Sequence, residues 1–288
     1  MSNKKLPINN RILNKCPLPF RYPGGKFYAL GILEPFWSKI EHDDYREPFA
    51  GGASVFFNKP LVKYNWLNDL DSELITTYQT MSVPTQRQLL TKMLNNEVAT
   101  KERWREVLNF KPTNPLEIAF QYYYLNRTSF SGKMVSPGWG YREKRSLPPE
   151  RWYERINPCG DKLAGTEITN LDFSEVIDSP SKGKSVLMFV DPPYFAPPKR
   201  KHYRNGFDLQ DHIRLRDNLK KTNYKFFLTY DDVPEIREMY SWAKIHELEF
   251  VYRVDNSNVQ LGTRKIGFEL IITNFDLPKQ PNLFENND

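Results

Sequence analysis

The sequence predicts an α/β fold with a largely parallel sheet and an inserted helical segment. Strand-like and helix-like segments alternate at both ends of the 288-residue chain, and such alternation requires crossover connections between parallel strands. Residues 186–190 form a continuous apolar run, VLMFV, which is typical of a strand covered on both faces. Residues 72–126 keep helical spacing throughout, and they therefore predict an insertion into the sheet.

The first elements follow from turn residues and periodicity. Pro-Gly-Gly at residues 23–25 predicts a type II turn, and helical spacing follows over residues 27–40. A short strand is expected to end near Glu47. Alternating apolar residues over 62–66 predict a second strand, which ends near Asp69.

The remaining elements complete the alternation. Residues 127–155 are irregular and rich in Gly, Pro, aromatic and basic residues, with Trp152 and Tyr153 expected to pack in a short helix. Asp232 is the expected N-cap of a helix that runs to about residue 243. Further strands are predicted at 167–171, 186–190, 225–229, 245–254 and 268–275, and a further helix at 209–221. We place the sheet domain at 1–71 and 160–288, and the helical subdomain at 72–159.

Composition narrows the class of protein. A net charge of +6 favours a polyanionic partner such as nucleic acid. The polar first fifteen residues and the lack of a long apolar stretch predict a cytoplasmic protein with no membrane association. Cys16 and Cys159 have no zinc or redox spacing, and the four histidines form no ligand-like cluster. We therefore expect neither a disulfide nor a metal.

The strongest chemical motif is Asp191-Pro192-Pro193-Tyr194, directly after the apolar strand. Ligands of such sheets bind beyond the carboxyl ends of the strands. An amino group conjugated to a base is a poor nucleophile until acceptors hold its hydrogens, and the Asp191 carboxylate and the Pro192 carbonyl can do so. Tyr194 offers a face on which an extruded base can stack. The alternative is that the tetrad is an ordinary turn that ends the strand, with an aspartate as a cap, and has no catalytic role.

A second motif is the Gly-rich turn Ala50-Gly51-Gly52-Ala53, with Asp69 about twenty residues further on. Small residues let a ligand approach the backbone, and an acidic residue at the next strand end can bind ribose hydroxyls. The Gly-x-Gly-x-x-Gly spacing of a nicotinamide dinucleotide site is absent from this turn. S-adenosylmethionine has a sulfonium cation and no phosphate, so this turn suits it better.

Together these motifs resemble the Dam-type (D12 class, group alpha) DNA adenine-N6 methyltransferases. The matching segments lie in the family order from Phe20 to Phe275. They are Tyr22–Lys26, Glu47–Phe56, Leu67–Asp69, Asp172–Phe173, Asp191–Tyr194, Thr263–Lys265 and Glu269–Leu270.

The resemblance implies a Rossmann-like S-adenosylmethionine-dependent methyltransferase fold, a mixed seven-stranded sheet with an inserted helical DNA-recognition subdomain. It also implies that Asp191, Pro192 and Tyr194 hold the target adenine. The implied cofactor-binding residues are Tyr22, Lys26, Phe49, Ala50, Gly51, Asp69, Asp172, Phe173 and Asp191.

Basic and polar residues in two segments are the expected DNA contacts. Arg127 and Lys133 are candidates for guanine contacts, and the basic run after the tetrad is a candidate for phosphate contacts. The full set is Arg127, Ser131, Lys133, Arg142, Lys199, Arg200, Lys201 and Arg204. The family pattern Asn-Arg-x-x-x-Asn-Gly-Leu-x-Arg-x-Asn is broken at residues 131, 133, 135 and 137. With Val135 in place of an arginine, the target can be GATC or another short adenine-containing site.

The expected reaction is site-specific methylation of adenine N6 in double-stranded DNA by base flipping and direct transfer, with S-adenosylmethionine as cofactor. A monomer is expected, and any cognate restriction endonuclease would act as a separate protein. The alternatives are an N4-cytosine or RNA methyltransferase of related fold, or a catalytically silent DNA-binding regulator. Glutamine methyltransferases usually begin the tetrad with Asn and N4-cytosine enzymes with Ser, so Asp191 favours adenine.

Overall fold

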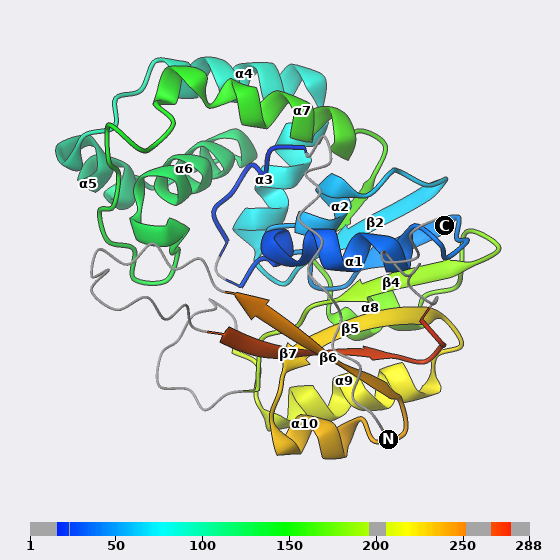
Figure 1. Ribbon diagram of the computed structural model, residues 1–288. Coiled ribbons are helices and arrows are strands. Elements are labelled where there is room, and N and C mark those ends of the chain that lie inside the picture. The colour runs from blue at the N-terminus through cyan, green and yellow to red at the C-terminus, as the bar shows by residue number, and fades with distance from the viewer. Residues whose placement is uncertain (1–15, 23, 196–205, 252–265, 278–288) are drawn as a thin grey trace, which may run out of the picture.

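The computed structural model describes residues 16–22, 24–195, 206–251 and 266–277 (Figure 1). Within these ranges the chain forms one seven-stranded sheet in the order β3-β2-β1-β4-β5-β7-β6. Its strands are β1 (Asp44–Glu47), β2 (Tyr64–Asn68), β3 (Glu167–Thr169), β4 (Val186–Val190), β5 (Lys225–Asp231), β6 (Lys244–Val251) and β7 (Ile266–Thr273). Only β7 runs antiparallel to its neighbours, β5 and β6. The predicted mixed α/β sheet is confirmed.

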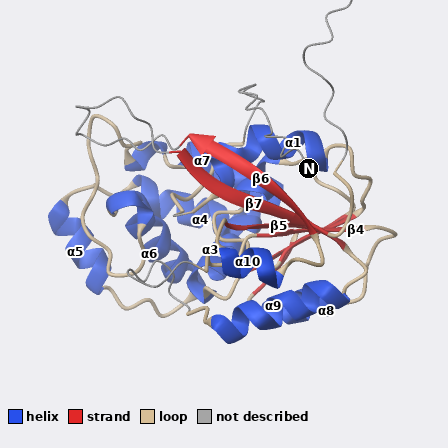
Figure 2. Ribbon diagram, turned by 60° about the horizontal axis from the view of Figure 1, so that its bottom comes forward, coloured by secondary structure: helices blue, strands red, loops and turns tan. Residues whose placement is uncertain are grey.

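Helices cover both faces of the sheet. They are α1 (Leu30–Trp37), α2 (Ser54–Asn58), α3 (Ser72–Ser82), α4 (Pro84–Asn95), α5 (Lys101–Asn109), α6 (Pro115–Thr128), α7 (Tyr153–Leu163), α8 (Phe173–Asp178), α9 (Leu209–Lys221) and α10 (Pro234–Met239). Short 3-10 turns lie at Lys26–Ala29, Phe130–Gly132 and Pro149–Arg151. Figure 2 shows α8 and α9 together on one side of the strands, with α1 on the other.

Alternation along the central strands assigns side chains to the two faces. In β4, Leu187 and Phe189 join the core under α1, α2 and α3, whereas Val186, Met188 and Val190 join the core under α8, α9 and α10. This follows from the two-residue period of a strand. A strand buried on both faces must be apolar throughout, which explains the VLMFV run.

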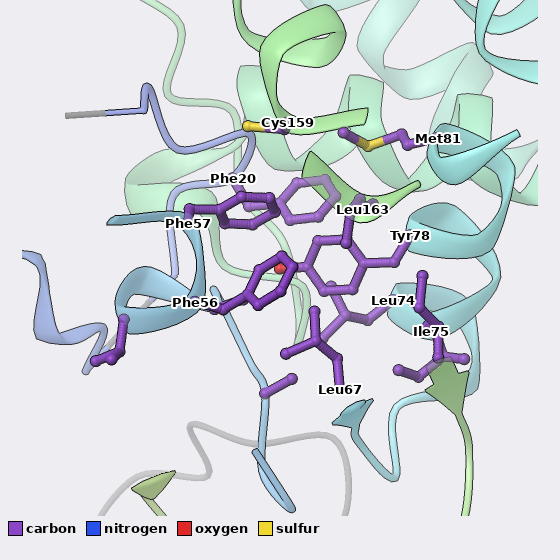
Figure 3. Packing of buried hydrophobic residues seen from close by; sticks show 14 of the residues in the cluster. Phe20, Phe56, Phe57, Leu67, Leu74, Ile75, Tyr78, Met81, Cys159 and Leu163 are labelled. Atoms are coloured by element: carbon purple, nitrogen blue, oxygen red, sulfur yellow. The ribbon is translucent and has the colours of Figure 1, made fainter. Parts of the chain in front are cut away.

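Helices α3 to α7 form a layered cluster beside the sheet (Figure 1). Its core is continuous with the sheet core, because Tyr78 of α3 packs with Phe57 of α2 and Phe20 (Figure 3). The predicted subdomain boundary at residues 159 and 160 falls inside α7. The division of the chain into a sheet domain and a helical subdomain remains a prediction.

Several local expectations are wrong in detail. Val233 caps α10, while the Asp232 carboxylate binds Arg237 of the same helix, with an oxygen 2.6 Å from Arg237 Nε. Trp152 is buried as predicted, but Tyr153 is 40% exposed. The two cysteines are free thiols, yet their sulfur atoms lie only 3.8 Å apart. The sequence did not predict this proximity, because the two sulfur atoms are brought together by the packing of residues 16–20 on α7.

None of the helices in the described ranges is both long enough and apolar enough to cross a membrane.

Candidate active site

One pocket lies where the parallel strands end. Its lining comes from the turn before α1, from the segments that follow β1, β2, β3 and β4, and from α9. Carboxyl ends of neighbouring parallel strands meet at one edge of a sheet, so motifs far apart in sequence converge there. All nine residues expected to bind a cofactor line this pocket: Tyr22, Lys26, Phe49, Ala50, Gly51, Asp69, Asp172, Phe173 and Asp191.

The conformation of the turn after β1 explains why it contains two glycines. Gly51 has a φ of +45°, and a Cβ atom there would lie 2.8 Å from the Tyr22 ring. A Cβ atom on Gly52 would meet Tyr22 equally closely. The Ala50 amide donates to the Asn68 carbonyl, at an N–O distance of 2.7 Å, which ties the turn to the end of β2. Small residues are therefore required for the close approach of Tyr22 to this turn.

Asp69 at the end of β2 faces the same turn. One carboxylate oxygen accepts from the Gly51 amide at 2.8 Å, and the other accepts from the Asp71 amide at 2.9 Å. Burial raises the pKa of Asp69 to about 6, against the opposing effect of these hydrogen bonds. Each oxygen keeps a second lone pair with which to accept a ligand hydroxyl.

An aromatic wall closes the side of the pocket next to α8 and α9. The Phe49 and Phe173 rings stack with centroids 5.2 Å apart, and Phe207 meets Phe49 edge-on at 5.7 Å. The Arg214 guanidinium lies 4.6 Å above the Phe173 ring centroid and binds the Asp172 carboxylate at 3.0 Å. Sequence reasoning missed Phe207 and Arg214, because no motif marks them.

The tetrad lies at the end of β4. Lys26 Nζ is 2.6 Å from Asp191 Oδ1, and the Thr229 hydroxyl donates to the same oxygen at 2.6 Å. Lys26 is only 2% exposed, and its ammonium lies 4.8 Å from the Tyr194 ring centroid and 3.9 Å from the Glu269 carboxylate. Pro193 lines the pocket beside Asp191. Asp191 therefore carries a charge partner and stands at the rim of the pocket.

Acidic residues dominate the pocket. Among the residues that the structure describes, its lining includes six carboxylic side chains but only two cationic ones, Lys26 and Arg214. The acidic set is Glu47, Asp69, Asp71, Asp172, Asp191 and Asp211. This imbalance in a chain of net charge +6 favours a cationic ligand over a phosphorylated one.

Glu47, at the inner wall, is buried at the end of β1. Its Oε1 accepts from the Tyr45 hydroxyl at 2.6 Å and from the Phe56 amide at 2.8 Å. Burial nevertheless raises the pKa of Glu47 to about 8. The side chain is therefore largely protonated at neutral pH.

The Glu47→Gln variant should flatten the pH dependence of stability. In the wild type, the folded chain keeps a proton on Glu47 that the unfolded chain releases above pH 4.5, so the free energy of unfolding falls as pH rises from 4.5 to about 8. Glutamine preserves both accepted hydrogen bonds and does not titrate. Urea unfolding at several pH values in this window measures the difference, and parallel pH profiles for the two proteins would contradict it.

The segment expected to contact DNA forms a hairpin-like loop after α6. The Phe130 amide donates to the Gly138 carbonyl at 2.7 Å, and the Gly140 amide donates to the Thr128 carbonyl at 2.9 Å. Ser131 is exposed, with a φ of +54°, and Lys133 is partly exposed. Asn126 is buried below the loop and binds the Gly132 carbonyl.

Arg127 lies in a different environment from Lys133. It is 5% exposed, and its Nε is buried with no hydrogen-bond partner among the described residues. It lines a cavity, here named the arginine cavity, together with Arg21, Arg145 and Arg155. Burial, together with Arg21 and Arg155, lowers the pKa of Arg127 to about 10. A side chain enclosed in this way does not fit the expected reach into a DNA groove.

The other predicted DNA contacts are only partly described. Arg142 is exposed. Lys199, Arg200, Lys201 and Arg204 lie outside the described residues, as does the predicted loop element Thr263–Lys265.

Strand order, the antiparallel β7 and a pocket at the carboxyl ends of the parallel strands are the features of a methyltransferase-type α/β enzyme. Residues 22–254 match the D12 class N6 adenine-specific DNA methyltransferase family, and the chain belongs to that family. It is an adenine-specific DNA methyltransferase. This assignment selects adenine in DNA over the cytosine, RNA and silent-regulator alternatives.

Curated relatives span most of the chain. The type II methyltransferase M.CviBI of Paramecium bursaria Chlorella virus NC1A is 26% identical over 88% of this chain and 98% of its own length. The DNA adenine methylase of Escherichia coli (strain K12) is 27% identical over 87% of this chain and 92% of its own. The DNA N-6-adenine-methyltransferase of Escherichia phage P1 is 27% identical over 77% of this chain, but over only 30% of its own length.

Proposed function

We propose that this enzyme takes its methyl group from S-adenosylmethionine and transfers it directly to N6 of an adenine flipped out of double-stranded DNA at a short specific site. The observation that carries the proposal is the convergence of nine motif residues on one acidic pocket with Asp191 at its rim. The protein acts as a monomer in the cytoplasm, and any cognate restriction endonuclease is a separate protein.

The pocket residues fit the proposed cofactor. S-adenosylmethionine supplies an electrophilic methyl group on a sulfonium cation. The carboxylic side chains around the pocket, apart from the protonated Glu47, favour that cation. The stacked Phe49 and Phe173 rings offer an apolar face for its adenine, and Asp69 can accept hydrogen bonds from its ribose.

The tetrad residues would act on the target amino group. Asp191 and the Pro192 carbonyl accept its two hydrogens, which localises the nitrogen lone pair and stabilises the positive charge that develops on N6. Tyr194 stacks on the extruded base. No covalent enzyme intermediate is needed, so the rate comes from positioning and electrostatics.

Two surfaces would divide the contact with DNA. The hairpin loop with Lys133 reads base edges. The arginine cavity takes a backbone phosphate, because four arginines line it and none of the described lining residues is acidic. The proposal thus moves Arg127 from base reading to phosphate binding.

Transfer of labelled methyl groups tests the function. The purified chain is incubated with unmethylated duplex DNA and methyl-labelled S-adenosylmethionine, and the DNA is hydrolysed for nucleoside analysis. We expect label in N6-methyladenine at a short recurring sequence, and little label in single-stranded RNA. Label in cytosine, or none with any substrate, would overturn the proposal.

The Asp69→Ala variant should weaken cofactor binding by about 1.5–3 kcal/mol, the range for hydrogen bonds to a charged group. Wild-type affinity should also fall as pH drops through about 6, where Asp69 takes up a proton. Asp69→Asn retains one acceptor but does not titrate, so its affinity should not change with pH in this range. Calorimetry between pH 5 and pH 8 measures both effects, and unchanged affinity in Asp69→Ala removes the residue from the site.

A further inference from the structure

The end of β5 lies beside the catalytic tetrad, and its side chains alternate between the two faces of the sheet. Phe226, Leu228 and Tyr230 join the core under α9 and α10, whereas Phe227 joins the opposite core. The two-residue period therefore directs Thr229 and Asp231 to the side of Phe227. Leu228 pairs with Val190 in the parallel register, which brings Thr229 next to Asp191.

These two side chains hold both ends of the tetrad segment. The Thr229 hydroxyl donates to Asp191 Oδ1 at 2.6 Å, and Asp231 Oδ1 accepts from the Phe195 amide at 3.0 Å. Pro192 and Pro193 have no N–H groups, so between these two contacts only Tyr194 has a backbone N–H that could donate a hydrogen bond. The side chains of Thr229 and Asp231 therefore contribute to anchoring the segment.

Both polar contacts that the described residues make with the Asp191 carboxylate fall on one oxygen. Lys26 Nζ and the Thr229 hydroxyl both lie 2.6 Å from Oδ1. The alternative acceptor for Thr229, the Val190 carbonyl, is farther away at 3.4 Å. Two donors on Oδ1 restrict the rotation of the carboxylate, and Oδ2 keeps both of its lone pairs for a ligand as far as the described residues are concerned.

We propose that Thr229 is a positioning residue for methyl transfer, which together with Lys26 holds Oδ1 so that Oδ2 accepts a hydrogen of the target amino group. This inference rests on the proposed function of Asp191. Thr229 is only 1% exposed, so it acts through Asp191 and does not itself touch the substrate. Asp231 has the companion role of holding the far end of the segment through the Phe195 amide.

Two substitutions distinguish the effect of the Thr229 hydroxyl from the effect of the side-chain volume. Thr229→Val keeps the shape and removes the donor, whereas Thr229→Ser keeps the donor. In single-turnover assays with saturating DNA and S-adenosylmethionine, Thr229→Val should slow methyl transfer by about 10- to 100-fold, the loss expected for one hydrogen bond to a charged group. Thr229→Ser should stay within about threefold of the wild type, because the donor remains. Cofactor affinity and the thermal unfolding midpoint should not follow the rate.

The outcomes distinguish this inference from the proposed function. Methyl transfer by Thr229→Val at the wild-type rate, or equal losses in Thr229→Val and Thr229→Ser, would overturn the positioning role while the wild type still methylates adenine. An absence of adenine methylation in the wild type would instead overturn the proposed function. If Thr229→Val does not fold, Thr229→Ala is compared with Thr229→Ser, and a rate loss confined to Thr229→Ala supports the role.

Discussion

The Asp191→Ala variant is expected to lose methyl transfer by at least about a hundred- to a thousandfold, the usual cost of removing one group that stabilises charge developing in a transition state. Asp191 stands at the rim of the pocket, with Oδ1 held by Lys26 and Thr229. Its removal takes away an acceptor for the target amino group and leaves the strands that position it in place. Single-turnover transfer to unmethylated duplex DNA measures the loss.

Folding and binding controls accompany this variant. Lys26 loses its charge partner but keeps the Gly24 carbonyl at 3.1 Å and the Glu269 carboxylate at 3.9 Å, so the fold should persist. The unfolding midpoint and the DNA affinity should therefore remain near the wild-type values. Robust turnover by Asp191→Ala would remove Asp191 from the catalytic role. Loss of folding would require the test to be repeated with Asp191→Asn, which retains the shape.

The second large effect concerns DNA binding. Arg127→Gln should weaken binding to all sequences alike and lower the slope of log affinity against log salt concentration by about one, as expected for one lost phosphate contact. Lys133→Ala should instead change which sequences are methylated, because a base contact carries about 1–3 kcal/mol of discrimination. Arg127 lies in the last turn of α6 and is buried at the arginine cavity, whereas Lys133 lies in the loop after that helix and is partly exposed.

Matched control variants distinguish a lost phosphate contact from a general loss of positive charge. Lys221→Gln also removes one positive charge, but from the exposed end of α9 on the opposite face of the sheet, and it should leave the salt slope unchanged. A variant neutralised at Lys199, Arg200 and Lys201 should also weaken binding to all sequences alike, and should lower the salt slope by up to about three. Methylation mapping and salt-dependent binding measure both roles. If Arg127→Gln alters the methylated sequence and Lys133→Ala alters only the rate, the roles are reversed.

The strand pattern and the tetrad could be predicted from residues alone. The VLMFV run of β4 needs apolar side chains on both faces, and the Asp-Pro-Pro-Tyr segment follows it at a strand end. Both patterns depend only on residues that are close in sequence, so they can be recognised without the tertiary structure. The resemblance to known methyltransferases added Tyr22, Lys26 and Asp172, and the common sheet edge explains why they line the same pocket as Asp191.

Other features of the structure could not be predicted from the sequence. Arg214 belongs to an ordinary amphipathic helix, and nothing about its neighbours marks it as a pocket residue. Asp232 could cap α10 by its position, but Arg237 one turn later offered its carboxylate a stronger partner. Cys16 and Cys159 are separated by 143 positions and meet only because residues 16–20 pack on α7.

By itself, the sequence determined the α/β class, the order of the elements, the tetrad and the family. Tertiary structure alone decided that Thr229 supports Asp191, that Arg127 is enclosed with three other arginines, and that the pocket is acidic in a basic protein. The physical reason is the range of the forces involved. Helix, strand and turn preferences are set by residues a few positions apart, whereas burial, charge partners and shared cavities depend on which distant segments the sheet order brings together.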